Sequence, residues 1–324
     1  MKVTGAVRSA IFARMPEPAP SRLKVYLAFA AIYIIWGSTY YAIREALVGF
    51  PPFLLGGLRF LIAALIMFAW CVATGQRIGP GRDLRDAAIA GFLLLFVGNG
   101  AVVWVERSIP SSVVAIVIAV APLSFIVLDR RQWHVNFKSR STLLGVVCGF
   151  AGVIVLFSGR IAEQVGTTSV SPAFGSILVL LCAIIGWPAG SLHAKYHPAT
   201  LPNTVISAWQ MLTGAVCFLS VGVGRGEVSD FHPASVPFSA WAALLYLIVF
   251  GSIIGFSAYV WLLQVRPATQ VSTYAYVNPV VAVLLGVFAG SEVLGWRELA
   301  GLAIILGGVL LINLARYRAA AVNR

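Results

Sequence analysis

The sequence predicts an all-α integral membrane protein with ten transmembrane helices, arranged as two inverted five-helix repeats with both termini in the cytoplasm. Three observations predict this fold: the apolar composition, the length of the apolar runs, and a repeated order of Trp, Gly and Pro. Of the 324 residues, 60% are hydrophobic and only 10% are charged, and the mean hydropathy is +0.91. Soluble domains carry about 25% charged residues. Much of this apolar surface must therefore face lipid.

The apolar runs are each about 20 residues long, which is the length that crosses a bilayer as a helix. Charged residues, Pro or Gly separate them. The first run is longer than the core of a signal peptide, so we expect it to remain as a membrane span. The predicted helices cover residues 25–47, 52–73, 85–106, 110–128, 141–157, 174–195, 203–222, 238–262, 268–288 and 295–315.

The Lys and Arg residues are unevenly divided between the two sides of the predicted membrane. With the N-terminus inside, seventeen fall on the cytoplasmic side and four on the outer side. Cytoplasmic connections carry this excess in membrane proteins, so it also accounts for the net charge of +12. No basic patch with interleaved aromatic residues stands outside the apolar runs, which argues against a nucleic-acid partner. We expect a multi-pass protein of the inner or plasma membrane.

The two halves of the sequence repeat one another. A shift of 151 residues places Trp36 on Trp187, and a shift of 157 places Pro122 on Pro279. Five helices per half is an odd number, so the halves must cross the membrane in opposite senses. Many secondary transporters use such inverted repeats to build two conformations around a midplane site. The predicted segments are a cytoplasmic N-terminal tail (1–24), a first repeat (25–157), an outer linker (158–173), a second repeat (174–315) and a cytoplasmic tail (316–324).

Several stretches of the sequence resemble the drug/metabolite transporter superfamily, and within it the EamA-type exporters of the YedA/PecM-like branch. They include IYIIWGSTYYAIRE in the first helix, GNGAVVWVERSIPS across the third and fourth, and YAYVNPVVAVLLG in the ninth. The resemblance covers roughly residues 25–315. It implies an exporter of small metabolites with ten helices, whose central cavity is lined by helices one, three, four, six, eight and nine.

Aromatic and hydrogen-bonding side chains fall at membrane depth, where unsatisfied polar groups are costly. Trp36 and Trp187 lie near the centres of their helices, either as walls of a cavity or in helix packing beside neighbouring glycines. Pro122 and Pro279 each remove a backbone donor, which indicates a hinge beside the cavity or a kink that neighbouring helices repair. The candidate cavity residues are Trp36, Thr39, Tyr40, Asn99, Trp104, Trp187, Ser252, Tyr274 and Asn278.

Four charged residues, Arg44, Glu45, Arg59 and Glu106, lie toward the outer ends of the first three helices. Charges inside membrane spans are rare and often functional. Arg59 is the deepest of them, and its guanidinium can extend outward, pair with Glu106 or Glu45, or meet a substrate carboxylate. Glu106 is the acidic candidate for proton coupling. A structural ion pair and a role in transport both fit this pattern.

Together these features predict a secondary transporter that exports small amphipathic metabolites, either amino acids or drug-like compounds, by alternating access about a midplane cavity. The alternatives are an uncoupled facilitator and a membrane sensor or structural component. An enzyme is not expected, because no acid, base or metal groups recur at a recognised spacing. His193 and His197 lie four residues apart without a third ligand, so neither a metal nor another cofactor is expected. The expected partners are the lipid bilayer, a small-molecule substrate, protons and, through helices five and ten, a second copy of the chain.

Overall fold

The computed structural model of the chain describes residues 20–79, 81–107, 114, 118–165, 170–290 and 295–322. The described part is helical throughout, with no strand. The third predicted span of the first half is one long helical rod, in which a π-helical segment, η1, joins two α-helices. The helices of the first half are α2 (Arg22–Leu47), α3 (Pro52–Ala73), α4 (Arg82–Gly91), η1 (Phe92–Asn99), α5 (Gly100–Val105), α7 (Ala121–Leu128), η2 (Arg130–Gln132), α8 (Trp133–Asn136) and α9 (Arg140–Val165).

The second half has the same kind of interrupted rod, in which a π-helical segment, η4, joins α12 to α13. Its ninth predicted span is divided, because α14 ends before α15 begins. The helices of this half are α10 (Val170–Tyr196), α11 (Asn203–Gly224), η3 (Pro233–Ser235), α12 (Phe238–Tyr246), η4 (Leu247–Phe256), α13 (Ser257–Val265), α14 (Ala268–Val271), α15 (Tyr274–Gly290) and α16 (Trp296–Val322).

Six continuous helical segments of the described chain are long and apolar enough to cross a membrane. They correspond to the first, second, third, sixth, seventh and eighth predicted spans. A seventh arises if the pair 130–136 and 140–155, bent by 100°, is one span. Part of the fourth predicted span lies outside the described residues, the ninth is divided, and the tenth is represented by the apolar stretch Leu299–Leu314 within α16. The protein is therefore an all-helical membrane protein, and the count of ten stays a prediction.

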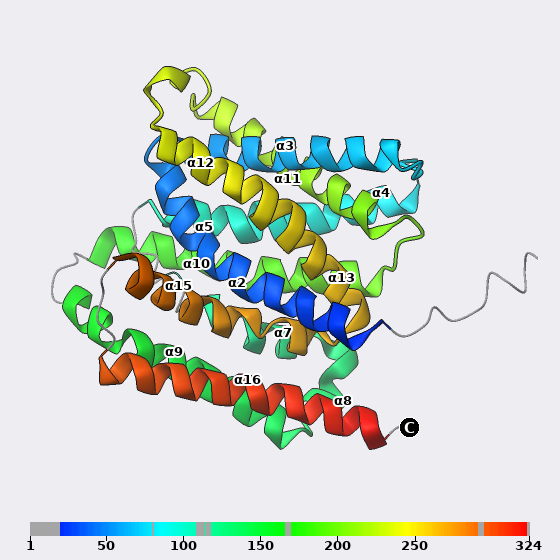
Figure 1. Cartoon of the computed structure of the whole chain (residues 1–324), viewed down its shortest axis with the longest axis vertical. Helices are drawn as coiled ribbons and strands as arrows, with labels where there is room; N and C mark the ends of the chain where they lie inside the picture. Colours follow the sequence, from blue (N-terminus) through cyan, green and yellow to red (C-terminus); the bar gives the residue numbers. More distant parts are fainter. Residues whose placement is uncertain are drawn as a thin grey trace, which may run out of the picture.

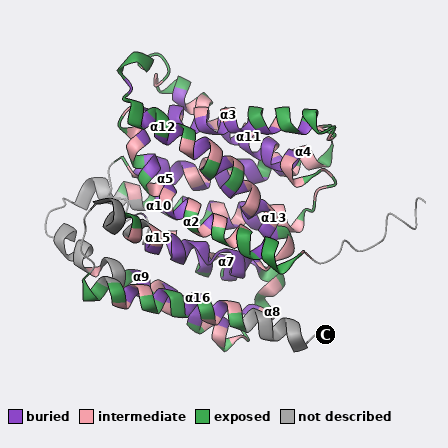
Figure 2. Ribbon diagram, viewed as in Figure 1, coloured by how far each residue is buried: buried purple, intermediate pink, exposed green. Residues whose placement is uncertain are grey.

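The long helices lie side by side across the molecule, with α3 and α11 at one edge and α9 and α16 at the other (Figure 1). Between these edges lie α2, α10, α15 and the two rods that contain the π-helical segments. The first residues of α2 and the last residues of α16 reach the same end of the molecule (Figure 1). Buried residues concentrate on the faces that these helices turn toward one another (Figure 2).

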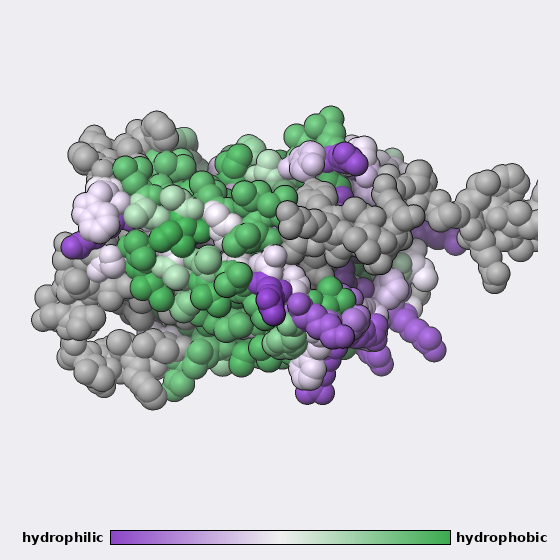
Figure 3. Space-filling view, turned by 90° about the horizontal axis from the view of Figure 1, so that it is seen from below, coloured by the Kyte–Doolittle hydropathy of each residue, from purple (hydrophilic) through white to green (hydrophobic). Residues whose placement is uncertain are grey.

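The outward faces of the edge helices are apolar. On α9 and α16, for example, Leu144, Val147, Leu306 and Leu310 are more than half exposed. Figure 3 shows this side of the molecule: apolar side chains cover its middle, and hydrophilic side chains gather toward one end. Lipid chains can cover such a band, while the hydrophilic end meets water and headgroups.

A loop between the seventh and eighth spans caps the start of α3. Helix α3 begins at Pro52, and its N-cap residue Pro51 offers no side-chain hydrogen bond. The Glu227 carboxylate accepts instead, at 2.9 Å from the Phe53 nitrogen and 3.0 Å from the Leu54 nitrogen. An acidic group in this place satisfies free backbone donors and complements the helix dipole.

The change Glu227→Ala is expected to lower the free energy of unfolding by about 1 kcal/mol, the usual cost of a lost N-cap. Thermal unfolding in detergent would show this as a lower Tm than that of the wild type. Asp230→Ala is the matched control, because Asp230 lies exposed in the same loop and does not cap α3. Equal Tm values for Glu227→Ala and the wild type would show that the cap contributes nothing.

Candidate functional site

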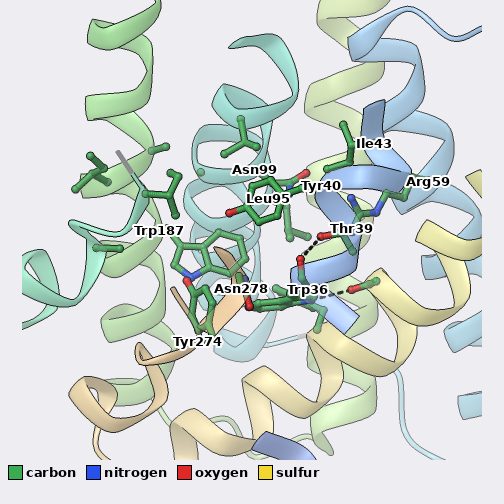
Figure 4. Close-up of a pocket in the computed structure, with 18 of the residues that line it drawn as sticks. Trp36, Thr39, Tyr40, Ile43, Arg59, Leu95, Asn99, Trp187, Tyr274 and Asn278 are labelled. Carbon is green, nitrogen blue, oxygen red and sulfur yellow. Dashed lines mark hydrogen bonds between the residues drawn. The ribbon is translucent and has the colours of Figure 1, made fainter. Parts of the chain in front are cut away.

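A cavity of about 80 Å³ lies at the centre of the helix assembly. One water molecule occupies roughly 10–15 Å³ in this measure, so the cavity has room for several waters or for part of a small metabolite. Figure 4 shows how the labelled side chains from α2, α3, η1, α10 and α15 converge on it. The lining residues are Trp36, Thr39, Tyr40 and Ile43 of α2, Arg59 and Phe60 of α3, Leu95, Gly98 and Asn99 of η1, Val102 of α5, Ala121 of α7, Ala183, Ile184 and Trp187 of α10, Gly251 and Phe256 of η4, Tyr274 and Asn278 of α15, and Ile118.

An aromatic cluster closes one end of the cavity. Its members, Trp36, Trp187, Tyr259 and Tyr274, come from four helices, and Trp36 contacts the other three with ring centroids 4.9–5.4 Å apart. Trp187 and Tyr259 are also in contact, at 5.4 Å. Such ring pairs contribute about 0.5–1.5 kcal/mol each beyond the area that they bury. The cluster lies on the side of the cavity toward the beginning of α2 and the end of α13.

Hydrogen bonds fix the polar atoms of this cluster. The Trp36 indole nitrogen donates to the Gly251 carbonyl at 3.1 Å, and that carbonyl belongs to the π-helical segment η4. The Trp187 indole nitrogen donates to the Tyr259 hydroxyl at 2.8 Å, and Ser191 bonds to the same hydroxyl at 2.6 Å. A π-helical turn perturbs the regular i→i+4 bonding of a helix, so its carbonyls can accept from side chains. The buried indoles are therefore held in one orientation.

The two tryptophans occupy matching positions against the two π-helical rods. A Cβ atom added to Gly255 would lie 2.6 Å from the Trp36 indole nitrogen, and one added to Gly98 would lie 2.9 Å from the Trp187 ring. Gly98 and Gly255 are paired by the shift of 157 residues in the sequence. Each indole thus rests on a glycine of the opposite half, and only glycine leaves room for it.

Two asparagines place unsatisfied oxygens at the cavity. The side-chain oxygens of Asn99 and Asn278 are buried, and neither has a hydrogen-bond partner among the described residues. The Tyr40 hydroxyl lies close to the Asn278 side chain. Thr39, which also lines the cavity, bonds back to the Trp36 carbonyl at 2.7 Å. Buried polar atoms without partners are costly, so waters or a bound polar molecule are the expected partners of the two asparagines.

Arg59 also lines the cavity, although the resemblance described above does not place its helix there. Its side chain is 5% exposed. The guanidinium donates from Nε to the Ser252 hydroxyl at 2.8 Å, and its Cζ atom lies 4.8 Å from the centre of the Phe60 ring. Ser252 is fully buried and does not line the cavity, so it supports Arg59 rather than reaching the cavity itself.

One interpretation of the sequence was an ion pair between Arg59 and an outer carboxylate. The described residues contain no such ion pair. No carboxylate there lies within 4.0 Å of Arg59. Both Glu106 oxygens are buried without a hydrogen-bond partner in the described chain, beside the Tyr40 hydroxyl and the positive charge of Arg44. Arg44 itself is exposed, and neither it nor Glu106 lines the cavity.

Trp104, a candidate cavity residue from the sequence, is not among the side chains that line the cavity. Its ring packs instead against Phe53, with centroids 5.5 Å apart, and the guanidinium of Arg225 lies 4.7 Å from its centre. Tyr259 is the aromatic residue that sequence reasoning missed. It follows Gly251 and Gly255 at the same spacing of four residues, so the helical face marked by these glycines was the signal that could have found it.

The two candidate hinge prolines lie in helices that line the cavity. Pro122 stands in the first turn of α7, where the missing backbone donor costs little. Pro279 lies inside α15, one residue after the cavity-lining Asn278, and so removes an interior hydrogen bond. Pro279 therefore interrupts the backbone hydrogen bonds inside its helix, as a hinge residue would. Pro122 instead lies at the start of its helix.

Near the end of α10, side-chain hydrogen bonds connect the ends of several helices. The Lys195 ammonium donates to the Leu263 carbonyl at 2.5 Å and to the Arg266 carbonyl at 2.7 Å, which caps α13. His193 bonds through Nε2 to Asp86 at 3.1 Å, and its ring stacks on that of His197. The two histidines therefore have structural partners of their own. These contacts tie α10 to α4 and α13 at this end of the cavity.

A cavity of aromatic and unsatisfied polar groups at the centre of a helical membrane protein is typical of small-molecule transporters. The comparisons with known proteins identify the group within that class. The model of the EamA-like transporter family matches the chain twice, over residues 23–158 and 173–314. The chain therefore belongs to the EamA-like transporter family.

Named relatives cover nearly the whole chain. The "uncharacterized inner membrane transporter YedA" of Escherichia coli K12 is 38% identical over 299 residues, which are 91% of this chain and 92% of the relative. "Protein PagO" of Salmonella typhimurium is 24% identical, over 91% of this chain and 94% of the relative. A crystal structure with 22% sequence identity shares the fold, with a TM-score of 0.72, and the match covers 92% of this chain and 99% of that one. The protein is thus a multi-pass transporter of the inner membrane.

Proposed function

We propose that this transporter exports small amphipathic metabolites, such as amino acids or drug-like compounds, by alternating access about the central cavity. The observation that carries the proposal is the aromatic cluster, to which both halves of the chain contribute. Trp36 and Trp187 meet with ring centroids 5.4 Å apart at one end of a cavity that holds unsatisfied polar groups. Rearranging this cluster would open the cavity at that end, and re-forming it would close the cavity again.

Alternating access requires two halves that can exchange roles, and several features support the inverted repeat of residues 25–157 and 174–315. The two matches of the family model begin 150 residues apart, which is close to the shift of 151 found in the sequence. The π-helical segments η1 and η4 occupy equivalent places in the two halves. Each tryptophan of the cluster also packs on a glycine of the opposite half. In this proposal both termini are cytoplasmic, and the aromatic cluster closes the cytoplasmic end.

Counterflow in proteoliposomes tests transport itself. Vesicles that contain the purified protein are loaded with unlabelled amino acids and amphipathic dyes in separate preparations, and uptake of the same labelled compound is followed. A transporter produces transient accumulation of the labelled compound, whereas a sensor or structural protein produces none. Uptake equal to that of empty vesicles for every compound would contradict the proposed substrates.

Coupling to protons is proposed through Glu106. A buried carboxylate without a hydrogen-bond partner is costly in its charged form, and this suits a group that binds and releases a proton during transport. The change Glu106→Gln is expected to remove the acceleration of efflux by a pH gradient while counterflow at equal pH persists. Glu45→Gln is the control, because Glu45 is a carboxylate in the last turns of α2 whose oxygens, unlike those of Glu106, are not buried without a partner. Unchanged pH dependence in Glu106→Gln would favour uncoupled facilitation.

A homodimer through α9 and α16 is a further proposal about assembly. Their glycine-bearing faces already pack against one another, since a Cβ atom on Gly145 would lie 2.7 Å from the Gly308 carbonyl oxygen. A second copy would therefore have to use the outward apolar faces of these helices, which lipid can also cover. The mass of the protein in a lipid nanodisc distinguishes one copy from two.

A further inference from the structure

We propose that Arg59, held in place by Ser252, forms an anion-binding site in the cavity, and that the transported compounds carry a carboxylate joined to an apolar body. This inference rests on the proposed transport function and narrows it to one substrate class. It comes from the combination of a buried cation without a partner and an aromatic wall across the same cavity.

The positive charge of Arg59 has no counterion in the described part of the chain. Its side chain is only 5% exposed, and its one hydrogen bond to a described residue runs from Nε to the neutral Ser252 hydroxyl. A charge in a membrane interior is costly unless it is paired. A bound anion would supply the missing counterion, and the guanidinium fork can hold a carboxylate with two parallel hydrogen bonds.

Among the described residues that line the cavity, none is acidic and could take the place of such an anion. Arg59 is the one charged residue among the lining side chains of the described chain, and the other polar members are neutral. An empty cavity therefore carries a net positive charge, which favours anionic or zwitterionic compounds over cationic dyes.

The fold itself does not require a cation at this position. The shift of 151 residues pairs Arg59 with Gln210 of α11. Gln210 is fully buried like Arg59, yet it is neutral. The equivalent helix thus packs in the other half without a charge, so the charge of Arg59 is better explained by binding than by packing.

The geometry of the cavity separates the two chemical ends of the proposed substrate. Figure 4 shows Arg59 on one side, and Trp187 and Tyr274 on the other. A carboxylate at Arg59 would direct an attached aromatic or aliphatic group toward the cluster. Gly251 keeps this arrangement open, because a Cβ atom there would lie 2.9 Å from the Arg59 Nη2 atom.

The test compares four compounds with the same aromatic body: 3-phenylpropionate, phenylalanine, phenylalaninamide and 2-phenylethylamine. Counterflow is measured in proteoliposomes, and binding is followed in detergent by tryptophan fluorescence. We expect the wild type to favour the two carboxylates over the two amines at least tenfold, the effect of one charge-assisted pair. Arg59→Gln should abolish this preference, and Arg59→Lys should retain part of it.

Arg225→Gln is the matched control, because it removes an exposed arginine that contacts Trp104 and Phe53 outside the cavity. It should keep the carboxylate preference. A purely structural role of Arg59 would weaken all four compounds equally in Arg59→Gln and leave their ratio unchanged, and this result would overturn the inference. Transport of the amines as efficiently as the carboxylates by the wild type would also overturn it, while the proposed transport function would stand. Absence of binding and counterflow for all four compounds would overturn it as well, and amino acids and dyes of other shapes would then test the transport function separately.

Discussion

Replacement of Trp36 by alanine is expected to lower the rate of substrate counterflow at least tenfold. The indole contacts Trp187, Tyr259 and Tyr274 and donates to a π-helical carbonyl, so its loss removes the centre of the aromatic cluster. Truncating a buried tryptophan to alanine costs about 3–5 kcal/mol in soluble cores. Part of this lost free energy would destabilise the conformation in which the aromatic cluster closes its end of the cavity. Counterflow of the preferred compound in proteoliposomes measures the effect.

Two further variants separate closure from general damage. Trp36→Phe keeps an aromatic ring but loses the hydrogen bond to Gly251, so it should give an intermediate rate. Trp70→Ala removes an indole that is 62% exposed on the outward face of α3, and it should behave as the wild type. Wild-type counterflow in Trp36→Ala would show that the cluster does not take part in transport.

A large loss of stability is expected from Gly308→Ala. A Cβ atom at this position would lie 2.7 Å from both the Gly145 carbonyl oxygen and the Gly149 nitrogen of α9. These are backbone atoms, so the two helices must separate. Overpacking of this kind costs about 1–3 kcal/mol, and close approach through glycines is a main source of helix association in membranes. Thermal unfolding in detergent should therefore show a clearly lower Tm.

The neighbouring residue supplies a matched control on the same helix. A Cβ atom at Gly307 would meet nothing within 4 Å, and alanine is a better helix former than glycine. Gly307→Ala should consequently leave Tm unchanged or slightly raised. Equal losses in both variants would indicate that the glycines act through backbone flexibility rather than through the contact between α9 and α16.

The long membrane helices could be predicted from the sequence because their physics is local. An apolar run of about 20 residues in lipid must be helical, and the predicted segments 25–47 and 203–222 differ by only a few residues from α2 and α11. The repeat in the sequence also paired Trp36 with Trp187 as candidates, and in the structure their ring centroids lie 5.4 Å apart. The residue types were therefore sufficient to predict the long helices and the pairing of these two tryptophans.

The direction of individual side chains could not be predicted, because it depends on irregular turns and on neighbouring helices. Trp104 follows the π-helical segment η1, and a widened turn rotates every later side chain relative to an ideal helix. An apolar sequence without a polar face gives no sign of this rotation, so the direction of the Trp104 side chain could not be predicted. The partner of Arg59 was equally hidden, because Ser252 lies 193 residues away on η4.

Access of the cavity to both sides of the membrane is the central claim of this account, and labelling of a cavity cysteine tests it most directly. Asn99→Cys is placed in a background where Cys71, Cys148, Cys182 and Cys217 are serine. A membrane-impermeant maleimide is then applied to right-side-out and to inside-out vesicles. Tyr41→Cys, on a side chain 65% exposed on the surface of α2, is the control for labelling from the lipid side. Alternating access predicts that the thiol introduced by Asn99→Cys reacts from both sides and that a transported compound slows both reactions. Reaction from one side only, with and without that compound, would contradict it.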